Sequence, residues 1–396
     1  MNVLVIPTSI PREDNPSRGI FIVRRLQQYE KFGVDYTAVS FDFADSSIVS
    51  LIRKITKNTK SRLMDSYDGV KFKYVLLRRG LIGTAVQLLN PNGYKSIVAK
   101  FADKISRVVN IDDFDVIHAH GMYAIPAGEI ARLLAERYGK PYVVTLHGGD
   151  VNDVMPKRRE YIETLEKAAK VIFVSNAILQ KAKSFGYSGK NSVVIPNGYD
   201  PEIFKPMNKV EVRKKFEIYK EGYKYVGFVG NLIETKRADK LGEIFQLIQK
   251  IFPNVYFIVV GDGHLKEKIQ QETKDLQILF TGRVEQKQVA LYMNAMDVMI
   301  LPSRNEGFGA VAIEAQACGT CVVGSSNGGI PEAIGSEDYV VEDGPEFEKR
   351  FAEKVCSCLN VMYDEDYLMK RVRIFEWDNI VREELQIYEG ITRMYH

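Results

Sequence analysis

Short apolar runs alternate with amphipathic segments along the whole chain. In the first half, segments 18–33 and 124–139 have helical periodicity and end in glycine, as many helices do. The strands predicted for this half are 2–7, 36–41, 70–77, 116–120, 142–147, 171–175 and 193–198. Continuous apolar strands that alternate with helices are typical of a parallel sheet covered on both faces.

The second half repeats this theme. A segment with three prolines, 196–216, separates the halves and is interpreted as an interdomain connection. The strands predicted after it are 225–230, 255–263, 276–283, 298–303, 322–326 and 339–343. We therefore expect two doubly wound α/β domains, 1–200 and 201–375, followed by an amphipathic helix at 376–396. Such sheets bind ligands beyond the carboxyl ends of their strands, so the cleft between the domains is the predicted site.

Composition and hydropathy indicate a globular protein and argue against a secreted or membrane-spanning one. The 396 residues have an ordinary globular balance, with 45% apolar and 27% charged residues. The N-terminal residues lack the pattern of a signal peptide, and no apolar run has the ~18–20 residues of a membrane span. We therefore expect a cytoplasmic protein with reduced cysteines.

One stretch of the sequence is strongly basic and raises the question of a membrane contact. Residues 51–100 hold 11 basic and 2 acidic side chains, mixed with aliphatic residues. One interpretation is contact with an anionic membrane surface at the inner face of the cell membrane, or with a lipid substrate. The other is a solvated loop and helix face. No nucleic-acid-binding motif accompanies the stretch, so we expect no nucleic acid partner.

The loop at 302–309 is the first candidate site. It follows a predicted strand, and a helix begins near Gly309, which is the geometry that directs free backbone N–H groups at an anion. Glu306 and Glu314 stand on either side of that helix start. Because carboxylates accept hydrogen bonds from vicinal diols, the pair suits a ligand with both phosphates and hydroxyls, such as a nucleotide sugar. An exposed loop Glu and a helix-surface Glu are the alternative.

Other strands end in candidate residues as well. Gly230 ends a strand before Asn231, and Lys236 and Arg237 precede the next helix. Lys236 is interpreted either as a cation that neutralises a diphosphate or as a solvated surface lysine. Arg18 and Gly19 precede a helix in the first half and form a second candidate phosphate contact.

Three of the five histidines lie at the ends of strands of the first half, so we expect them to converge on one sheet edge. His118 and His120 have the period of two that places them on one face of a strand, and His147 and Asp150 follow the next strand. His118 fits a structural role, His120 a substrate contact, and His147, Asp150 and Arg18 are candidate acceptor contacts. A zinc site is conceivable for this set of residues, but no fourth ligand is evident.

The chain has four cysteines, the number that a four-thiolate metal site needs, but their positions do not favour such a site. Cys318 ends a predicted helix, Cys321 opens an apolar strand, and Cys356 and Cys358 lie in a helix-like segment. Buried free thiols are the preferred interpretation.

These motifs resemble those of the retaining glycosyltransferases of family 4, the group 1 glycosyltransferases of GT-B fold. The matching stretches are VGNLIETKR, VVGDG, LFTGRV, DVMILPSRNEGFGAVAIEAQACGTCVV, SSNGGIPEAI, HAHG, TLHGGD, VSN and IPNGYD. The resemblance covers nearly the whole chain. It implies two Rossmann-like domains that face each other across a cleft, an acceptor-binding one and a nucleotide-sugar-binding one, and a C-terminal helix that crosses back to the first.

The resemblance also implies an activity and residue roles. A sugar would pass with retention from a UDP- or GDP-sugar to a hydroxyl of a glycan or lipid-linked acceptor, in bacterial surface polysaccharide or glycolipid synthesis, without a metal or other cofactor. By position, Glu306 would contact the sugar, Glu314 the ribose and Lys236 the diphosphate. The remaining donor contacts would be Gly307, Phe308, Gly309, Ala310, Arg283, Val284, Gly230, Gly19 and His120.

One position departs from the family pattern. Asn231 stands where the family usually has arginine. Asparagine donates a hydrogen bond but carries no charge, so one of two positive charges on the leaving diphosphate is missing. Arg237 and Arg18 are the candidate replacements. Two other functions stay open at this stage, a GT-B-fold nucleotide-sugar epimerase and a sugar-binding protein without catalysis.

Overall fold

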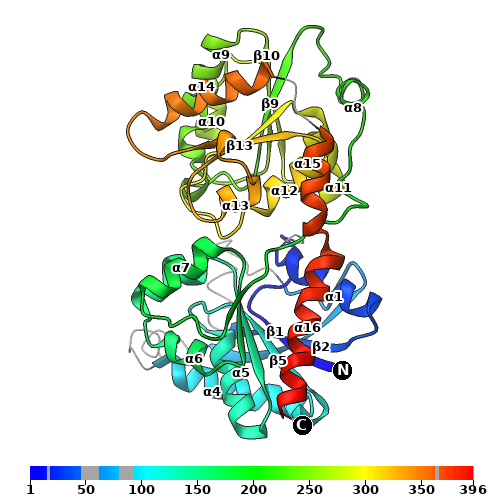
Figure 1. Cartoon of the computed structure of the whole chain (residues 1–396), viewed down its shortest axis with the longest axis vertical. Coiled ribbons are helices and arrows are strands. Elements are labelled where there is room, and N and C mark those ends of the chain that lie inside the picture. The colour runs from blue at the N-terminus through cyan, green and yellow to red at the C-terminus, as the bar shows by residue number, and fades with distance from the viewer. Residues whose placement is uncertain (16–17, 46–61, 80–92, 362–364, 396) are drawn as a thin grey trace. The chain divides into compact units, whose positions relative to one another are not determined.

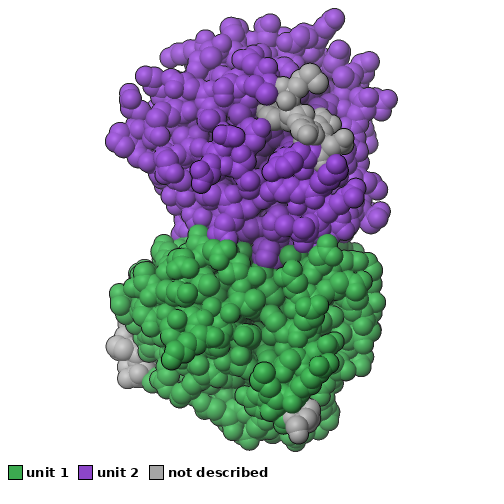
Figure 2. All heavy atoms as spheres, viewed as in Figure 1, with its two compact units in different colours: residues 1–195, 377–396 green, residues 196–376 purple. Residues whose placement is uncertain are grey.

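The computed structural model describes residues 1–15, 18–45, 62–79, 93–361 and 365–395. Two compact units make up the chain, Met1–Ile195 with Trp377–His396, and Pro196–Glu376 (Figure 2). The sequence analysis predicts the boundaries between these parts at 200–201 and 375–376. Residues 51–61 and 80–92 of the basic stretch lie outside the described residues, so its membrane role stays a prediction.

Unit 1 is built on a mostly parallel sheet. In its described part the sheet has eight strands in the order β3-β4-β2-β1-β5-β6-β7-β8, with only β3 antiparallel to its neighbour (Figure 1). The strands are β1 (Asn2–Pro7), β2 (Asp35–Asp45), β3 (Ser66–Tyr67), β4 (Val70–Arg79), β5 (Val116–His120), β6 (Tyr142–Leu146), β7 (Lys170–Phe173) and β8 (Ser192–Val194). The helices are α1 (Ile20–Lys31), α4 (Gly93–Val108), α5 (Ala127–Tyr138), α6 (Tyr161–Lys167), α7 (Asn176–Ser184) and α16 (Trp377–Tyr395).

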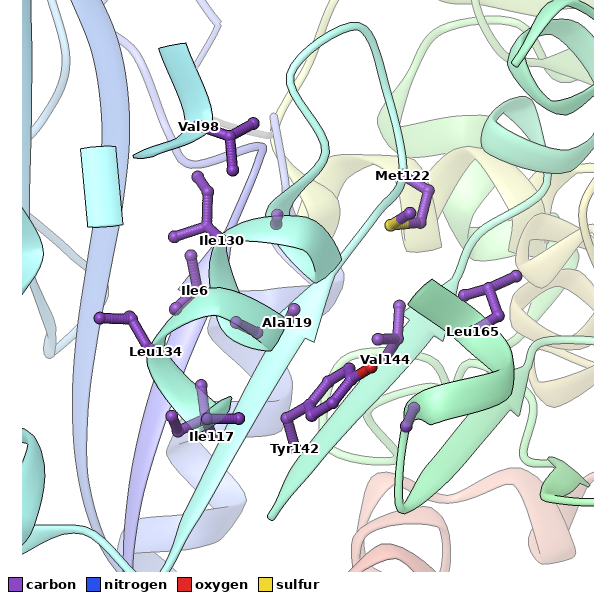
Figure 3. Packing of buried hydrophobic residues seen from close by; sticks show 14 of the residues in the cluster. Ile6, Val98, Ile117, Ala119, Met122, Ile130, Leu134, Tyr142, Val144 and Leu165 are labelled. Atoms are coloured by element: carbon purple, nitrogen blue, oxygen red, sulfur yellow. The ribbon is translucent and has the colours of Figure 1, made fainter. Parts of the chain in front are cut away.

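Alternate residues of the central strands of unit 1 point to opposite layers of helices. Ile6, Ile117 and Ala119 belong to a core shared with α4, α5 and α6, where Figure 3 shows them beside Ile130 and Leu134 of α5. Full burial of such a side chain stabilises the fold by roughly 1.5–3 kcal/mol. The residues between them on β5, His118 and His120, therefore face the other layer, which contains α1 and α16.

Unit 2 has a second sheet, parallel throughout. Its described strands run in the order β11-β10-β9-β12-β13-β14. They are β9 (Lys224–Val229), β10 (Val255–Val260), β11 (Ile278–Gly282), β12 (Val298–Leu301), β13 (Cys321–Ser325) and β14 (Val340–Val341). The helices are α8 (Lys209–Lys215), α9 (Leu241–Ile251), α10 (Lys266–Glu272), α11 (Gln286–Ala295), α12 (Ala310–Ala317), α13 (Ile330–Ile334), α14 (Phe347–Leu359) and α15 (Glu365–Val372).

The cysteines are buried free thiols, as the sequence predicts. Cys321, Cys356 and Cys358 lie in the apolar core of unit 2 with residues of β9, β10, α9 and α14. Burial raises the pKa of the Cys356 thiol to about 11, and it raises the pKa of Cys318 as well. These thiols therefore stay protonated and serve packing.

Both sheets contain a point where the direction of strand addition reverses. In unit 2 the chain adds β10 and β11 on one side of β9 and then returns to add β12 on its other side. In unit 1 it adds β2 and β4 on one side of β1 and then β5 on the other. Ligands of open α/β sheets bind beyond the carboxyl ends of the strands at such switch points. The loops after β9, β12, β1 and β5 are therefore the places to look for a site.

Candidate active site

Glycines let the loops at the carboxyl edge of unit 2 pack backbone against backbone. A Cβ atom on Gly261, after β10, would lie 1.9 Å from the carbonyl oxygen of Gly230, after β9. One on Gly263 would lie 2.4 Å from the oxygen of Leu232. The amide of Leu232 in turn donates to the carbonyl of Asp262 at 3.0 Å. This contact explains why the sequence has glycine after both strands, and it fixes the path of the loop that carries Asn231 and Lys236.

Arg304 joins that loop to the loop after β12. Its backbone N–H donates to the carbonyl of Thr235 at 2.9 Å, and its Nη1 donates to the carbonyl of Glu234 at 2.7 Å. The guanidinium also binds both carboxylate oxygens of Asp239, at 2.5 and 2.8 Å. The hydrogen bond from Arg304 lowers the pKa of Asp239. The two loops on either side of the switch point are therefore held as one assembly.

Lys236 and Glu306 meet at the centre of this assembly. Nζ of Lys236 lies 2.5 Å from Oε1 of Glu306, and the two side chains are 23% and 14% exposed. The sequence predicts both as substrate contacts, and the structure brings them together at the carboxyl edge of β9 and β12. Each side chain is thus still accessible to solvent, with its charge balanced by the other.

The helix that follows Glu306 begins as the sequence predicts. Gly309 precedes α12 with a φ of +91°, a conformation that suits glycine, and Ala310 is the first helical residue. Phe308 is buried, with its ring centroid 5.6 Å from that of Phe375. The first backbone N–H groups of α12 have no partner within the helix, so they face the end where Gly307 and Glu306 lie.

A second glycine contact supports the Glu306 loop. A Cβ atom on Gly328, after β13, would lie 2.0 Å from the carbonyl oxygen of Glu306, and its φ is +60°. The amide of Gly329 donates to the same carbonyl at 3.3 Å. The loop after β13 therefore braces the loop after β12, a contact that the sequence analysis did not anticipate.

The other predicted donor contacts in unit 2 occupy different environments. Asn231 is exposed, and Glu314 is half-buried in the second turn of α12. Arg283 is exposed and Val284 is half-buried, just after β11. Because β11 lies two strands from β9 in the described sheet, these two residues are farther from the switch point than Lys236 is.

Arg237 does not supply the positive charge that Asn231 lacks. Its side chain is 5% exposed and lies over the Phe347 ring, 3.8 Å from the centroid. Its guanidinium lies 2.6 Å from Asp343 and 3.6 Å from Glu348, and the pKa of Asp343 falls to about 2 chiefly because of that hydrogen bond. The expectation that Arg237 replaces a diphosphate-binding arginine is corrected by this pairing, because its charge is already neutralised inside unit 2.

In unit 1 the three predicted histidines form one cluster. The rings of His118 and His120 are 4.1 Å apart between centroids, and those of His120 and His147 are 5.5 Å apart and stacked. Nδ1 of His120 lies 3.3 Å from Nε2 of His147, and Nε2 of His118 lies 2.7 Å from the Thr145 hydroxyl. The prediction that these histidines meet at one sheet edge is confirmed, and His118 has the structural role expected of it.

The cluster contains four residues that the sequence analysis missed. Arg25 of α1 and Glu384 of α16 form an ion pair that is at most 1% exposed, with Nε 3.1 Å from Oε2. Tyr29 and Tyr388 both donate to Oε1 of Glu384, and the Tyr388 hydroxyl also contacts Nδ1 of His118. A signal was present, because these polar residues occupy positions within the buried stripes of α1 and α16.

Burial dominates the electrostatics of this cluster. The pKa values of His118, His120 and His147 are all lowered, first by desolvation. The next cause is Arg25 for His118 and His147, and His118 followed by Arg25 for His120. The pKa values of Tyr29 and Tyr388 are raised, first by burial and then by Glu384. The three histidines are therefore neutral near pH 7.

The remaining predicted residues of unit 1 have local structural contacts. Asp150 is fully buried and accepts hydrogen bonds from the backbone N–H groups of His147, Gly148 and Val151. Asp150 thus shapes the loop that carries His147 and is not itself exposed to an acceptor. Burial raises its pKa.

Gly19 is required by the path of the chain. Its φ is +69°, and a Cβ atom there would lie 2.4 Å from the carbonyl oxygen of Ser9. Nε of the neighbouring Arg18 donates to the Ser9 hydroxyl at 3.0 Å. Among the residues that the structure describes, no group of three or more His, Cys, Asp or Glu side chains could hold a metal ion.

Two family profiles match different parts of the chain. The family described as "Glycosyl transferases group 1" matches residues 209–364, and "Glycosyltransferase Family 4" matches residues 63–203. The protein is a group 1 glycosyltransferase of the family 4 type. The resemblance seen in the sequence is thereby confirmed, together with glycosyltransferase activity.

Relatives with assigned names are themselves glycosyltransferases. The enzyme is 28% identical to TuaC of Bacillus subtilis, a proposed teichuronic acid biosynthesis glycosyltransferase, over 86% of this chain and 85% of that protein. It is 30% identical to N-acetyl-alpha-D-glucosaminyl L-malate synthase of Bacillus anthracis, over 61% of this chain and 65% of that one.

Solved structures confirm the fold of the glycosyltransferase. The Anabaena protein HepE, crystallised with UDP and glucose, superposes with a TM-score of 0.68 at 17% identity and covers 98% of this chain and 100% of its own. The predicted α/β GT-B fold is therefore correct. Within the described ranges, no helix is both long and apolar enough to cross a membrane.

Proposed function

We propose that the enzyme is a retaining glycosyltransferase that moves a sugar from a UDP- or GDP-sugar to a hydroxyl of a glycan or lipid-linked acceptor. The contact between Lys236 and Glu306, at the switch point of unit 2, is the observation that carries this proposal. It places one cation and one anion where an open α/β sheet binds its ligand. A nucleotide sugar offers a complementary partner to each, a diphosphate for the lysine and sugar hydroxyls for the glutamate.

The chemistry of donor cleavage assigns a task to each residue. As the bond between the anomeric carbon and the diphosphate oxygen breaks, negative charge grows on the diphosphate. Lys236, the amide of Asn231 and the N–H groups at the start of α12 stabilise that charge. Glu306 accepts hydrogen bonds from the sugar, Glu314 holds the ribose, and His120 of unit 1 donates a hydrogen bond to the sugar. No metal is required for any of these contacts.

The ion pair also sets the state of the enzyme without donor. Lys236 and Glu306 neutralise each other until a donor arrives, and binding then exchanges that pair for lysine–diphosphate and glutamate–hydroxyl contacts. Because the donor gives each charge a new partner, the exchange leaves neither group buried and unpaired.

The name of one relative supports a proposal for the biological process in which the enzyme acts. TuaC carries a name from teichuronic acid biosynthesis, which supports a role in bacterial surface polysaccharide or glycolipid synthesis for this chain. An acceptor of that kind also suits the basic stretch at 51–100. Binding to vesicles that contain anionic lipid, compared with neutral vesicles, tests the association with the inner membrane surface.

A donor screen followed by product analysis tests the function. UDP- and GDP-sugars are compared by the rise in melting temperature that each causes, and the best donor is then incubated with acceptors. An α-linked product from an α-linked donor supports retention, whereas a β-linked product contradicts it. Interconversion of the free nucleotide sugar without an acceptor would instead show an epimerase.

A further inference from the structure

We propose that Arg25 is a positioning residue that holds His120 in the neutral form with its proton on Nε2, and that Glu384 of α16 holds Arg25 in place. This inference deepens the proposed function, because it rests on His120 as a hydrogen-bond donor to the sugar. It gives Arg25 of α1 and Glu384 of α16, which are not among the predicted substrate contacts, a defined effect on the reaction.

The hydrogen-bonding capacities of the side chains determine the form of His120. Nη1 of Arg25 lies 3.5 Å from Nδ1 of His120, and a guanidinium can only donate. Nδ1 must therefore be an acceptor, and the ring proton must reside on Nε2. Nε2 of His147, 3.3 Å from the same Nδ1, then also carries its proton.

Nε2 of His120 is left as a buried donor. It makes no hydrogen bond to the described protein, although His120 is only 2% exposed. A buried donor without an acceptor is destabilising, and a protein retains one where a ligand completes the bond. His120 is the last residue of β5, at the switch point of unit 1, so a ligand bound at that edge is the fitting acceptor.

Every charged or titratable group around His120 is consistent with its neutral form. Arg25 on α1 and Glu384 on α16 balance each other, and the lowered pKa values of His118 and His147 keep those rings neutral. Tyr29 and Tyr388 stay protonated and donate to Glu384. A second positive charge on His120 would stand 3.5 Å from the cation of Arg25, which disfavours protonation.

This arrangement defines what His120 can do in the reaction. With its proton fixed on Nε2, the ring is a hydrogen-bond donor toward the ligand and has no lone pair there to act as a base. Without Arg25, Nδ1 and Nε2 would compete for the proton, and the ring would gain charge more easily in mild acid.

Ring nitrogen shifts of ¹⁵N-histidine-labelled protein test the inference without any substrate. His120 is assigned by the signals that His120→Gln removes. In the wild type we expect the Nε2–H form throughout pH 5.5–8. Because Arg25→Met alone leaves Glu384 buried without a counter-ion, the test variant is Arg25→Met with Glu384→Gln, which is expected to fold. In this double variant we expect a mixture of tautomers, with protonation of His120 at a higher pH than in the wild type.

Two matched variants complete the experiment. Arg25→Lys retains a cation that only donates, so it should keep the Nε2–H form. Arg24→Met removes the neighbouring arginine of α1, which lies 2.6 Å from Asp68, and should leave the His120 shifts unchanged. An unchanged Nε2–H form in the folded double variant would overturn the role of Arg25.

Donor kinetics separate this inference from the proposed function. If His120 donates to the sugar, the double variant should lose about 3- to 10-fold in kcat/KM, the worth of one hydrogen bond. A changed tautomer with unchanged kinetics would support the role of Arg25 and would contradict the placement of the sugar against His120.

Discussion

The ammonium group of Lys236 lies 2.5 Å from a carboxylate oxygen of Glu306, although 70 positions separate the two residues in the chain. Each follows a different strand of one sheet, and Arg304 ties their loops together. The relationship makes the proposed diphosphate contact and the proposed sugar contact a single unit, so a change in either residue should alter the donor chemistry.

Replacement of Lys236 should impair the chemical step. With Lys236→Ala the leaving diphosphate loses its cation, and we expect kcat to fall by about 10²–10³, as for the loss of a transition-state hydrogen-bond donor. Steady-state kinetics with the best donor measure this effect. Lys240→Ala is the control, because Lys240 is solvent-exposed and pairs with Glu243 on the protein surface. Wild-type turnover in both Lys236→Ala and Glu306→Ala would show that the site assignment is wrong.

Introduction of arginine at position 231 should strengthen diphosphate binding. Asn231 is exposed beside the loop of Lys236, so Asn231→Arg can add a charge without burying it. A charge-assisted hydrogen bond is worth roughly 1.5–3 kcal/mol, and we expect the Kd of UDP to fall by about tenfold. Calorimetric titration at low and high salt measures the change, and the gain should shrink at high salt. A Kd that does not change at low salt would contradict the placement of Asn231 near the diphosphate.

The steric contact at Gly328 can be measured separately from the cost of placing a non-glycine residue at positive φ. A Cβ at Gly328 meets the Glu306 carbonyl at 2.0 Å, whereas one at Gly222, with a similarly positive φ of +74°, meets nothing within 4 Å. Gly222→Ala should cost about 1 kcal/mol, from the backbone alone. Gly328→Ala should cost more and should also raise the donor KM, because the Glu306 loop must move. Equal unfolding free energies for the two variants would contradict the close contact.

The buried histidines should make stability depend on pH. Their pKa values are lowered in the folded protein, so the unfolded chain, with pKa values near 6.5, binds more protons as the pH falls. The free energy of unfolding is therefore complete above about pH 6.5 and declines below it, by about 1.4 kcal/mol per pH unit for each histidine. Urea unfolding at pH 7 and pH 5.5 measures this slope.

Two histidine variants make that measurement specific. His118→Gln and His147→Gln should each reduce the slope by about one proton, because the pKa of each of these histidines is lowered in the folded protein. A free energy of unfolding that stays constant from pH 7 to pH 5.5 would contradict the neutral state of the cluster.

The sequence predicted those parts of the fold and site that depend on local pattern. Apolar runs of four to six residues located β1, β5 and β12 closely, because a strand buried on both faces has few alternatives. The period of two correctly placed His118 and His120 on one face. Glycine after β9 and β10 indicated the ligand-binding edge, and the structure adds the reason, which is backbone contact between the loops.

The features that sequence analysis missed depend on contacts between distant segments. Arg237 was expected to face a ligand, but its φ of +54° and its contact with Phe347 turn the guanidinium inward toward Asp343. The sequence around Arg25 and Glu384 indicates only two amphipathic helices. Their ion pair depends on the contact between α1 and α16, which are far apart in the chain. A polar residue in an apolar stripe is a weak signal on its own, and only its partner shows whether it is buried.

The discontinuity of unit 1 has a consequence for biosynthesis. Residues 377–395 leave the ribosome after all of unit 2, yet they provide the counter-ion of Arg25 and a hydrogen-bond partner of His118. While unit 2 is being translated, Arg25 therefore cannot yet pair with Glu384. The histidine cluster can be completed only after α16 has been translated.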